Sequence, residues 1–303
     1  MKPENTINNL NASVIITNYN GKDLLEKNLP FILIAKNKRE NRICEIIVVD
    51  DASKDESVDF IKSNFPDIRV IRHTRNRGFI ASTNTGARSA KYPLLVLLNS
   101  DVVVSDDFLV SVIQLFKDRS IFAVSMHEQG FGNALGEFKN GFFIHSSGKE
   151  TNQVKNTLWV SGGSGIFRRE YWMRLGGMDE KLYSPFYWED VDLGYRALKR
   201  GYRLVWDPDS KVTHEHESTM KKISNNYRNL IQQRNNLIFI WKNITSPSLI
   251  KKHIVALFTR ITKHPGYLIV SIMALIKIGK ILKSRRKEKK ECKVSDEAIL
   301  AEN

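Results

Sequence analysis

Four short runs of apolar, mostly β-branched residues, each ending in polar side chains, dominate the first hundred residues of the chain. These runs cover residues 14–17, 46–50, 68–73 and 94–99. The segments between them, 22–35, 56–64 and 78–90, space their apolar residues near the 3.6-residue period of a helix. Alternation of strand and helix predicts an α/β fold, a doubly wound and mostly parallel sheet with helices on both faces.

The composition narrows the class of protein further. With 42% apolar and 26% charged residues, the chain is not of the disordered, collagen-like or polytopic membrane type. Its two cysteines, Cys44 and Cys292, support neither a disulfide framework nor a cysteine zinc site, which favours a reducing compartment. Residues 1–11 are polar and lack the apolar stretch of a secretory signal, so we expect a cytoplasmic protein.

Positive charge is concentrated near the C-terminus. Residues 251–290 carry 12 Lys and Arg against one acidic residue, whereas residues 291–303 carry one against four. The apolar stretch 267–276 is ten residues long, well short of the about 20 needed to span a bilayer. We therefore expect a basic amphipathic helical segment over 246–290 that attaches peripherally to an anionic membrane surface, followed by an acidic, disordered tail.

The sequence leaves alternative partners for this segment. The same helices would also suit packing against the rest of the chain or against a second copy in a homo-oligomer. Nucleic-acid binding is not favoured, because the basic run has no interleaved aromatic residues.

Polar side chains gather where the four predicted strands end. In chain order they are Thr17 and Asn20, then Asp50 and Asp51, then Arg75, Asn76 and Gly78, then Asn99, Ser100 and Asp101. The carboxyl ends of parallel strands meet on one edge of a sheet, where ligands bind beside a topological switch point. One pocket is therefore expected to collect carboxylates, an arginine and small side chains.

Seven short motifs, in order along residues 11–245, resemble those of the family 2 glycosyltransferases, in particular their non-processive, rhamnosyltransferase-like members. They are Thr-Asn-Tyr-Asn at 17–20, Val-Val-Asp-Asp-Ala-Ser at 48–53, Asn-Arg-Gly-Phe at 76–79, Leu-Asn-Ser-Asp at 98–101, Gly-Gly-Met-Asp-Glu at 176–180, Trp-Glu-Asp-Val-Asp at 188–192, and Val-Thr-His at 212–214 with Ser218. The Gln-x-x-Arg-Trp element of processive members is absent, since residues 232–235 read Gln-Gln-Arg-Asn.

The resemblance implies a catalytic domain over residues 1–245 with a GT-A type, Rossmann-like fold. Such a domain transfers a sugar from a nucleotide-activated donor to an acceptor hydroxyl and inverts the anomeric carbon. A divalent metal, Mn²⁺ or Mg²⁺, stabilises the negative charge of the diphosphate leaving group.

The resemblance assigns Asp101 and His214 to the metal, for which oxygen ligands are suited. The family's aspartate-x-aspartate pattern is here Asn99-Ser100-Asp101, so one carboxylate is replaced by an amide. His216 is the alternative to His214. Asn99 and Asp101 would also suit a simple turn or a helix cap.

For the nucleotide, the resemblance places Thr17 and Asn20 near the base and ribose, with Asn99 and Ser100 beside them. Asp51 would accept a hydrogen bond from a pyrimidine imide, which favours UDP or dTDP, and Asp50 is the alternative. The same acidic run would also cap a helix.

Residues 75–78 are predicted to lie near the diphosphate. Arg75 would offset its charge, with Arg77 as the alternative, and Asn76 and Gly78 precede a helix whose first amides can approach a phosphate. Solvated loop residues are the alternative interpretation.

For catalysis, Asp190 matches the base that takes the acceptor proton, and Glu189 would hold the acceptor or a neighbouring loop. The acids at the start of this helix would also interact favourably with its dipole. The donor and acceptor loop is assigned to Gly162, Gly163, Ser164, Trp188 and Asp192.

The sequence thus predicts an inverting, metal-dependent glycosyltransferase at the inner membrane face. Its acceptor would be a carbohydrate or lipid-linked glycan of the cell envelope, and one sugar would be added per encounter. Because Asn99 replaces an acid, a catalytically silent protein that binds a sugar nucleotide or a glycan is the alternative.

Overall fold

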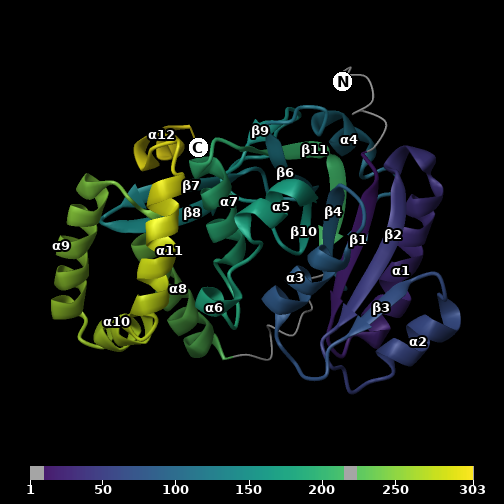
Figure 1. Cartoon of the computed structure of the whole chain (residues 1–303), viewed down its shortest axis with the longest axis horizontal. Helices are drawn as coiled ribbons and strands as arrows, with labels where there is room; N and C mark the ends of the chain where they lie inside the picture. The colour runs from purple at the N-terminus through teal and green to yellow at the C-terminus, as the bar shows by residue number, and fades with distance from the viewer. Residues whose placement is uncertain (1–9, 215–223, 303) are drawn as a thin grey trace.

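The computed structural model of the chain describes residues 10–214 and 224–302 (Figure 1). Within these residues, one sheet of nine strands has the order β3-β2-β1-β4-β10-β6-β11-β5, with β9 paired to β11, and β7 and β8 form a separate hairpin. The strands are β1 (Ala12–Asn18), β2 (Ile43–Asp50), β3 (Arg69–Arg72), β4 (Leu94–Asn99), β5 (Val102–Val104), β6 (Ile121–Glu128), β7 (Ala134–Lys139), β8 (Phe142–Ser147), β9 (Lys155–Asn156), β10 (Ser164–Arg168) and β11 (Arg203–His214).

Helices cover both faces of this sheet, because alternate side chains of each strand point to opposite sides. In β1, Ile15 packs in the hydrophobic cluster that includes α3 (Phe79–Ser89). Its neighbours Val14 and Ile16 pack in the cluster that includes α1 (Lys22–Asn37). The predicted doubly wound α/β arrangement is confirmed.

The sheet changes character after its first four strands. The strands β3, β2, β1 and β4 pair in parallel, as their alternation with helices predicts, whereas β10 is antiparallel to both β4 and β6. Periodicity gave no signal for β10, because all five of its residues are buried and none alternates with an exposed one.

The other elements up to residue 214 are η2 (Arg39–Asn41), α2 (Ser57–Asn64), α4 (Val110–Leu115), α5 (Arg169–Leu175), α6 (Glu180–Tyr183) and α7 (Glu189–Lys199).

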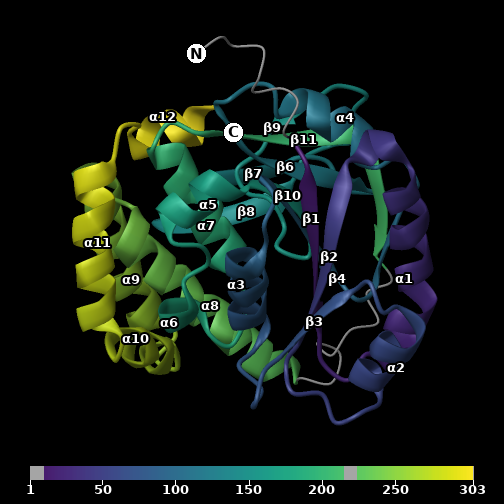
Figure 2. The same cartoon turned by 45° about the vertical axis from the view of Figure 1, so that its right-hand side comes forward.

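Five helices follow the sheet and lie together on one side of it (Figures 1 and 2). Apolar residues of this segment, among them Leu249, Val270 and Ile281, belong to the same hydrophobic cluster as β-sheet residues. Within residues 10–214 and 224–302, none of the helices combines the length and the hydropathy that crossing a membrane requires. The five helices are α8 (Asn225–Asn243), α9 (Pro247–Lys263), α10 (Tyr267–Leu275), α11 (Ile278–Glu291) and α12 (Asp296–Ala301).

The prediction of a disordered acidic tail over 291–303 is wrong for most of its length. Helix α12 forms there, and Asp296 is buried, 2.9 Å from the ammonium of Lys199. The Asp296 carboxylate also accepts hydrogen bonds from the Tyr195 hydroxyl and from the Ser246 amide. A buried lysine needs a counter-charge, so this acidic residue is held by a partner about a hundred positions away rather than left in solvent.

Candidate active site

Asp101 and His214 meet at the carboxyl-end edge of the sheet. Asp101 follows β4, and the antiparallel pairing of β5 with β11 places His214 opposite Val102. The Nε2 atom of His214 lies 2.9 Å from Oδ1 of Asp101. Its Nδ1 atom lies 3.8 Å from a carboxylate oxygen of Glu128 at the end of β6. Burial opposes protonation of the imidazole, but its bonds to Asp101 and Glu128 raise the pKa of His214 to about 9.

The Asp101–His214 pair fits a divalent cation. Asp101 is only 3% exposed, and its Oδ2 atom has no hydrogen-bond partner among the described residues. A buried carboxylate oxygen without a partner calls for an explanation, and a bound cation would supply one. The pair offers one carboxylate and one imidazole. Mn²⁺ accepts both kinds of ligand, whereas Mg²⁺ prefers the carboxylate oxygen. Residues 10–214 and 224–302 contain no group of three or more such side chains that could hold a metal by themselves.

Two further side chains bear on this pair. Glu128 was not predicted, because it ends β6, which lies beyond the four apolar runs that alternate with helices in the sequence. The alternative ligand His216 lies outside the described residues.

Asp51 organises the loop that follows β3. Its carboxylate accepts hydrogen bonds from the backbone amides of Arg77 at 2.9 Å and Gly78 at 2.7 Å. It also lies 2.7 Å from Nδ1 of His73, a residue that sequence reasoning missed. These contacts use both carboxylate oxygens, so pairing with a pyrimidine imide would require Asp51 to share one of them. Its predicted role toward the base stays a prediction.

The loops after β1 and β2 are tied together beside Asp51. The buried Asp50 accepts from the Ser53 amide and from the side-chain amide of Asn18, both at 3.1 Å. Asn20 donates its backbone N–H to the Ser53 hydroxyl, and its side-chain oxygen accepts from the Lys54 amide at 2.7 Å. Thr17, half-buried, precedes them at the end of β1. The strand ends thus meet on one edge, as the topology predicts.

The residues assigned to the diphosphate form an exposed loop in front of α3. Arg75 and Asn76 are exposed, and the side-chain oxygen of Asn76 accepts from the Gly78 amide at 3.1 Å. Because the Gly78 amide also donates to Asp51, it is already engaged inside the protein. Gly78 has a φ of +85° and a ψ of 167°, a conformation that only glycine adopts without strain.

Replacing Gly78 with alanine is therefore expected to destabilise the protein by about 1–3 kcal/mol. The nearest atom to an added Cβ is the Pro185 carbonyl oxygen at 3.8 Å, so the cost comes from the backbone and not from a clash. Gly279→Ala in α11 is the matched control, since nothing lies within 4 Å of its Cβ and no positive φ is required there. Urea denaturation measures both, and equal stability of the two variants would contradict the assignment of strain.

Glu189 and Asp190 begin α7, and α8 holds the loop in front of them. The buried Asn235 side chain donates to the carbonyl oxygens of Phe186 and Tyr187, at 2.9 and 2.8 Å. Trp188, with a φ of +75°, then turns the chain into the helix. This support fixes where the two acids enter the site.

Burial raises the pKa of both acids at the start of α7. The pKa of Glu189 rises further because the charge of Asp190 lies next to it. Burial also raises the pKa of Asp190, but the Val191 amide donates to its carboxylate, and this bond and the nearby Gly162 amide oppose the rise. Asp190 is therefore the member of the pair that ionises first.

The glycine loop joins Asp190 to the end of β4. The Gly162 amide lies near enough to the Asp190 carboxylate to lower its pKa. The next residue, Gly163, accepts the backbone N–H of Asn99 at 2.9 Å. A Cβ on Gly163 would lie 2.4 Å from the Asn99 side chain, so glycine permits this close approach. Asn99 in turn lies two residues before Asp101. Asp190 and Asp101 thus belong to one continuous set of contacts.

Three of the remaining predicted residues have structural partners. The Ser100 carbonyl oxygen accepts from the Asn28 side chain at 2.8 Å. Ser164 is buried in β10, where it pairs with Leu98. Trp188 packs edge-on against His145, which also contacts Trp159, an aromatic cluster that the motifs did not reveal.

Asp192 was assigned to the donor and acceptor loop, but its carboxylate is engaged inside the protein. Asp192 is fully buried, 2.7 Å from the guanidinium of Arg196 and 2.8 Å from the ammonium of Lys242. Despite its burial, these two cations lower the pKa of Asp192. Residues two apart on a helix point about 200° apart, so Asp190 and Asp192 cannot face the same site. Asp192 instead joins α7 to α8.

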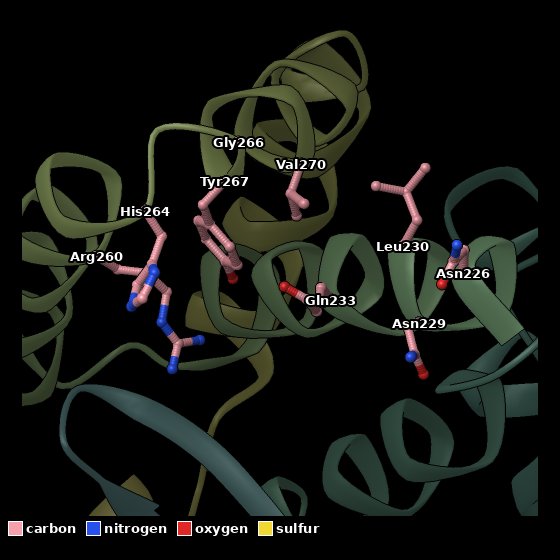
Figure 3. Close-up of a pocket in the computed structure, with 9 residues that line it drawn as sticks. All are labelled: Asn226, Asn229, Leu230, Gln233, Arg260, His264, Gly266, Tyr267 and Val270. Carbon is pink, nitrogen blue, oxygen red and sulfur yellow. The ribbon is translucent and has the colours of Figure 1, made fainter.

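A groove of about 750 Å³ lies apart from all these residues, between α8, α9 and α10 (Figure 3). Asn229 and Gln233 of α8 line it together with Tyr267 of α10. The guanidinium of Arg260, on α9, also lines it and lies 4.0 Å from the centre of the Phe142 ring. None of the predicted site residues reaches this groove.

Comparison with known proteins supports the family that the motifs indicate. Residues 13–175, more than half of the chain, match the model of the family described as glycosyl transferase family 2. A pre-mycofactocin glycosyltransferase of Mycobacterium tuberculosis is 29% identical over 184 residues, which cover 58% of this chain and 38% of the relative. The chain thus spans less than half the length of that relative.

Two solved structures are similar in fold. GalNAc-T7 with UDP, GalNAc and Mn²⁺ superposes with a TM-score of 0.61 at 19% identity, over 87% of this chain and 58% of that one. A mannosyltransferase of Pyrobaculum calidifontis with GDP-Man and Mn²⁺ has a TM-score of 0.58 at 17% identity, over 93% and 84%. These two structures show the GT-A fold, and the match over residues 13–175 establishes that the chain is a member of glycosyl transferase family 2.

Proposed function

We propose that this chain transfers a sugar from a nucleotide-diphosphate donor to an acceptor hydroxyl, with inversion at the anomeric carbon. The observation that carries the proposal is that the loop of Gly162 and Gly163 lies between the two acids: the Gly162 amide influences the pKa of Asp190, and Gly163 accepts the backbone N–H of Asn99, two residues before Asp101. A base for the acceptor and an anchor for the donor must flank the reacting carbon in an inverting transfer. The two carboxylates of this site suit those two roles.

The donor half of the site is assigned to Asp101 and His214. A divalent metal, when bound by this pair, neutralises the negative charge of the diphosphate as the donor bond breaks. The orphaned Oδ2 of Asp101 supports this assignment, and so do the two similar folds that hold a nucleotide with Mn²⁺. Since the pKa of His214 is about 9 without a metal, we expect metal binding to release a proton.

The acceptor half is assigned to Asp190. Its carboxylate is ionised in preference to that of Glu189, and the Gly162 amide orients it. Asp190 removes the proton from the acceptor hydroxyl as that oxygen attacks the anomeric carbon. Glu189 keeps its proton and can donate a hydrogen bond to the acceptor or to the neighbouring loop.

The substrate classes follow the motifs. A pyrimidine donor, UDP- or dTDP-linked, is proposed because Asp51 lies at the edge where a base would sit. The acceptor is proposed to be a carbohydrate or lipid-linked glycan of the cell envelope at the cytoplasmic membrane face. Transfer is proposed to be non-processive, because the Gln-x-x-Arg-Trp element is missing at residues 232–235.

Thermal unfolding with UDP, dTDP, GDP and CDP, each with and without Mn²⁺, tests the donor site. One pyrimidine diphosphate at about 100 times its Kd should stabilise the protein by about 2.7 kcal/mol, and only in the presence of Mn²⁺. Stabilisation by GDP alone would refute the pyrimidine assignment, and no stabilisation by any of the four would refute the donor site.

One observation favours a second candidate function. Asn99 stands where the family pattern has a carboxylate, so the site holds less negative charge for a metal. If the wild-type protein binds a nucleotide but transfers no sugar from any activated form of it, a catalytically silent binding protein is the better description.

A further inference from the structure

Helix α10 exposes an unusually apolar surface. Its buried side consists of Tyr267, Val270, Ser271 and Ala274, which pack toward α8. Its opposite side, here called the α10 face, is entirely apolar and exposed: Ile269 is 59% exposed, Ile272 49% and Ile276, just past the helix, 79%. The other members of the α10 face are Leu268 and Leu275.

The preceding helix also exposes bulky apolar residues. On α9, Ile254, Val255 and Phe258 are all more than 60% exposed. Soluble monomers rarely expose contiguous apolar patches of more than a few hundred Å², and larger ones mark sites of interaction with proteins or membranes. Two consecutive helices with bulky apolar residues turned outward therefore call for a partner.

Exposed lysines stand on the helices before and after α10. Lys263 in the last turn of α9 and Lys280 and Lys283 in α11 are exposed. The one acidic residue of residues 251–290, Glu288, is buried and paired with Arg200 at 2.7 Å, so it does not offset these charges at the surface. An anionic, apolar partner matches both properties of this surface.

We propose that the α10 face docks on a lipid bilayer that contains anionic lipids. Nine helical residues are too few to span a bilayer, so α10 would lie in the interfacial plane, with its apolar side in the acyl boundary and the lysines at the headgroups. A second copy of the chain is a poorer partner, because a two-fold contact would bring the same lysines together.

The docked orientation bears on the proposed function. In Figures 1 and 2, α10 lies at the same lower end of the molecule as the start of α8 and the loops after β2 and β3. Docking would therefore turn the carboxyl-end edge of the sheet, which carries the candidate site, toward the membrane. This orientation rests on the proposed function, whereas docking itself does not.

Vesicle sedimentation of the full chain tests the proposal. The protein should pellet with vesicles of phosphatidylcholine mixed with phosphatidylglycerol, and much less with phosphatidylcholine alone. The triple variant Ile269→Gln, Ile272→Gln, Ile276→Gln should bind mixed vesicles at least about 100-fold more weakly. The double variant Lys280→Gln, Lys283→Gln should bind mixed vesicles more weakly, by about fivefold per lysine, and should leave binding to phosphatidylcholine vesicles unchanged.

The matched control replaces two exposed apolar residues of α1, on the far side of the sheet, as Phe31→Gln, Ile34→Gln. This control should bind vesicles like wild type, and all variants should keep the wild-type thermal midpoint, because the replaced side chains are exposed. Absence of wild-type binding to mixed vesicles, or equal binding by the triple variant, would overturn the proposal.

Two further readouts separate the competing explanations. Wild-type dimerisation in vesicle-free buffer that is lost in the triple variant would make the α10 face a self-association surface and overturn the proposal. Nucleotide stabilisation in vesicle-free buffer reports on the donor site alone, so a failure of docking and a failure of the proposed function are seen separately.

Discussion

Asp190→Asn is expected to lower kcat by about 10³-fold while nucleotide binding stays at the wild-type level. The asparagine amide keeps the size of the side chain but cannot accept the acceptor proton, and general-base catalysis typically contributes 10²–10⁴-fold. Steady-state transfer assays with the donor identified by thermal unfolding measure the loss. Nucleotide-dependent stabilisation of the same variant shows that the donor site is intact.

Glu189→Gln is the matched control for this substitution. Because burial and the charge of Asp190 keep Glu189 protonated, a neutral amide of the same shape should cost less than about tenfold in kcat. If Glu189→Gln proved the more damaging change, the roles of the two acids would have to be exchanged.

The pH dependence of the wild-type enzyme gives an independent check on Asp190. A base must be ionised to act, and burial raises the pKa of Asp190 above the ordinary aspartate value of about 3.9. Activity should therefore be full above this raised pKa and fall as pH decreases through it, at a higher pH than an unperturbed aspartate would give. An acidic limb near pH 4 would contradict the burial argument.

Asp101→Ala is expected to abolish the Mn²⁺-dependent part of nucleotide binding and to lower turnover by at least about 10²-fold. The substitution removes the carboxylate whose Oδ2 has no hydrogen-bond partner within residues 10–214 and 224–302, and it also removes the hydrogen bond to His214. Calorimetric titration of UDP or dTDP with and without Mn²⁺ measures the effect. His214→Ala should weaken the same metal dependence less, because it leaves the carboxylate in place.

Asp107→Ala is the control for Asp101→Ala, since Asp107 is an exposed aspartate six positions further along the same segment. It should behave like wild type in every titration. Retention of a Mn²⁺-dependent response in Asp101→Ala would refute the assignment of this residue to the metal.

The local pattern was enough to predict the first half of the sheet. The apolar runs at β1, β2, β3 and β4 alternate with helices, and their carboxyl ends deliver Asp51 and Asp101 to one edge. The order of the motifs along the chain also identified Asp190 as the candidate for the catalytic base. The predicted strands and their shared edge are confirmed, because strand period, helix period and strand polarity depend on neighbouring residues alone.

Side-chain environment was not predictable in the same way. Asp190 and Asp192 stand two positions apart in one acidic motif, yet Asp190 contacts the Gly162 loop and Asp192 is buried between Arg196 and Lys242. Glu128 gave no signal in the sequence and nevertheless lies beside His214. The acidic composition of the tail predicted disorder, whereas Asp296 forms an ion pair with the buried Lys199.

The sequence by itself determined the fold class, the family motifs and the edge of the sheet at which they gather. The tertiary structure decided which acids are buried with cations, which lie in the candidate site, and which apolar side of α10 is left exposed. The reason is physical: the energy of a charge or an apolar side chain depends on what surrounds it in space. At Asp296, Glu128 and the α10 face, those surroundings come from residues far away along the chain.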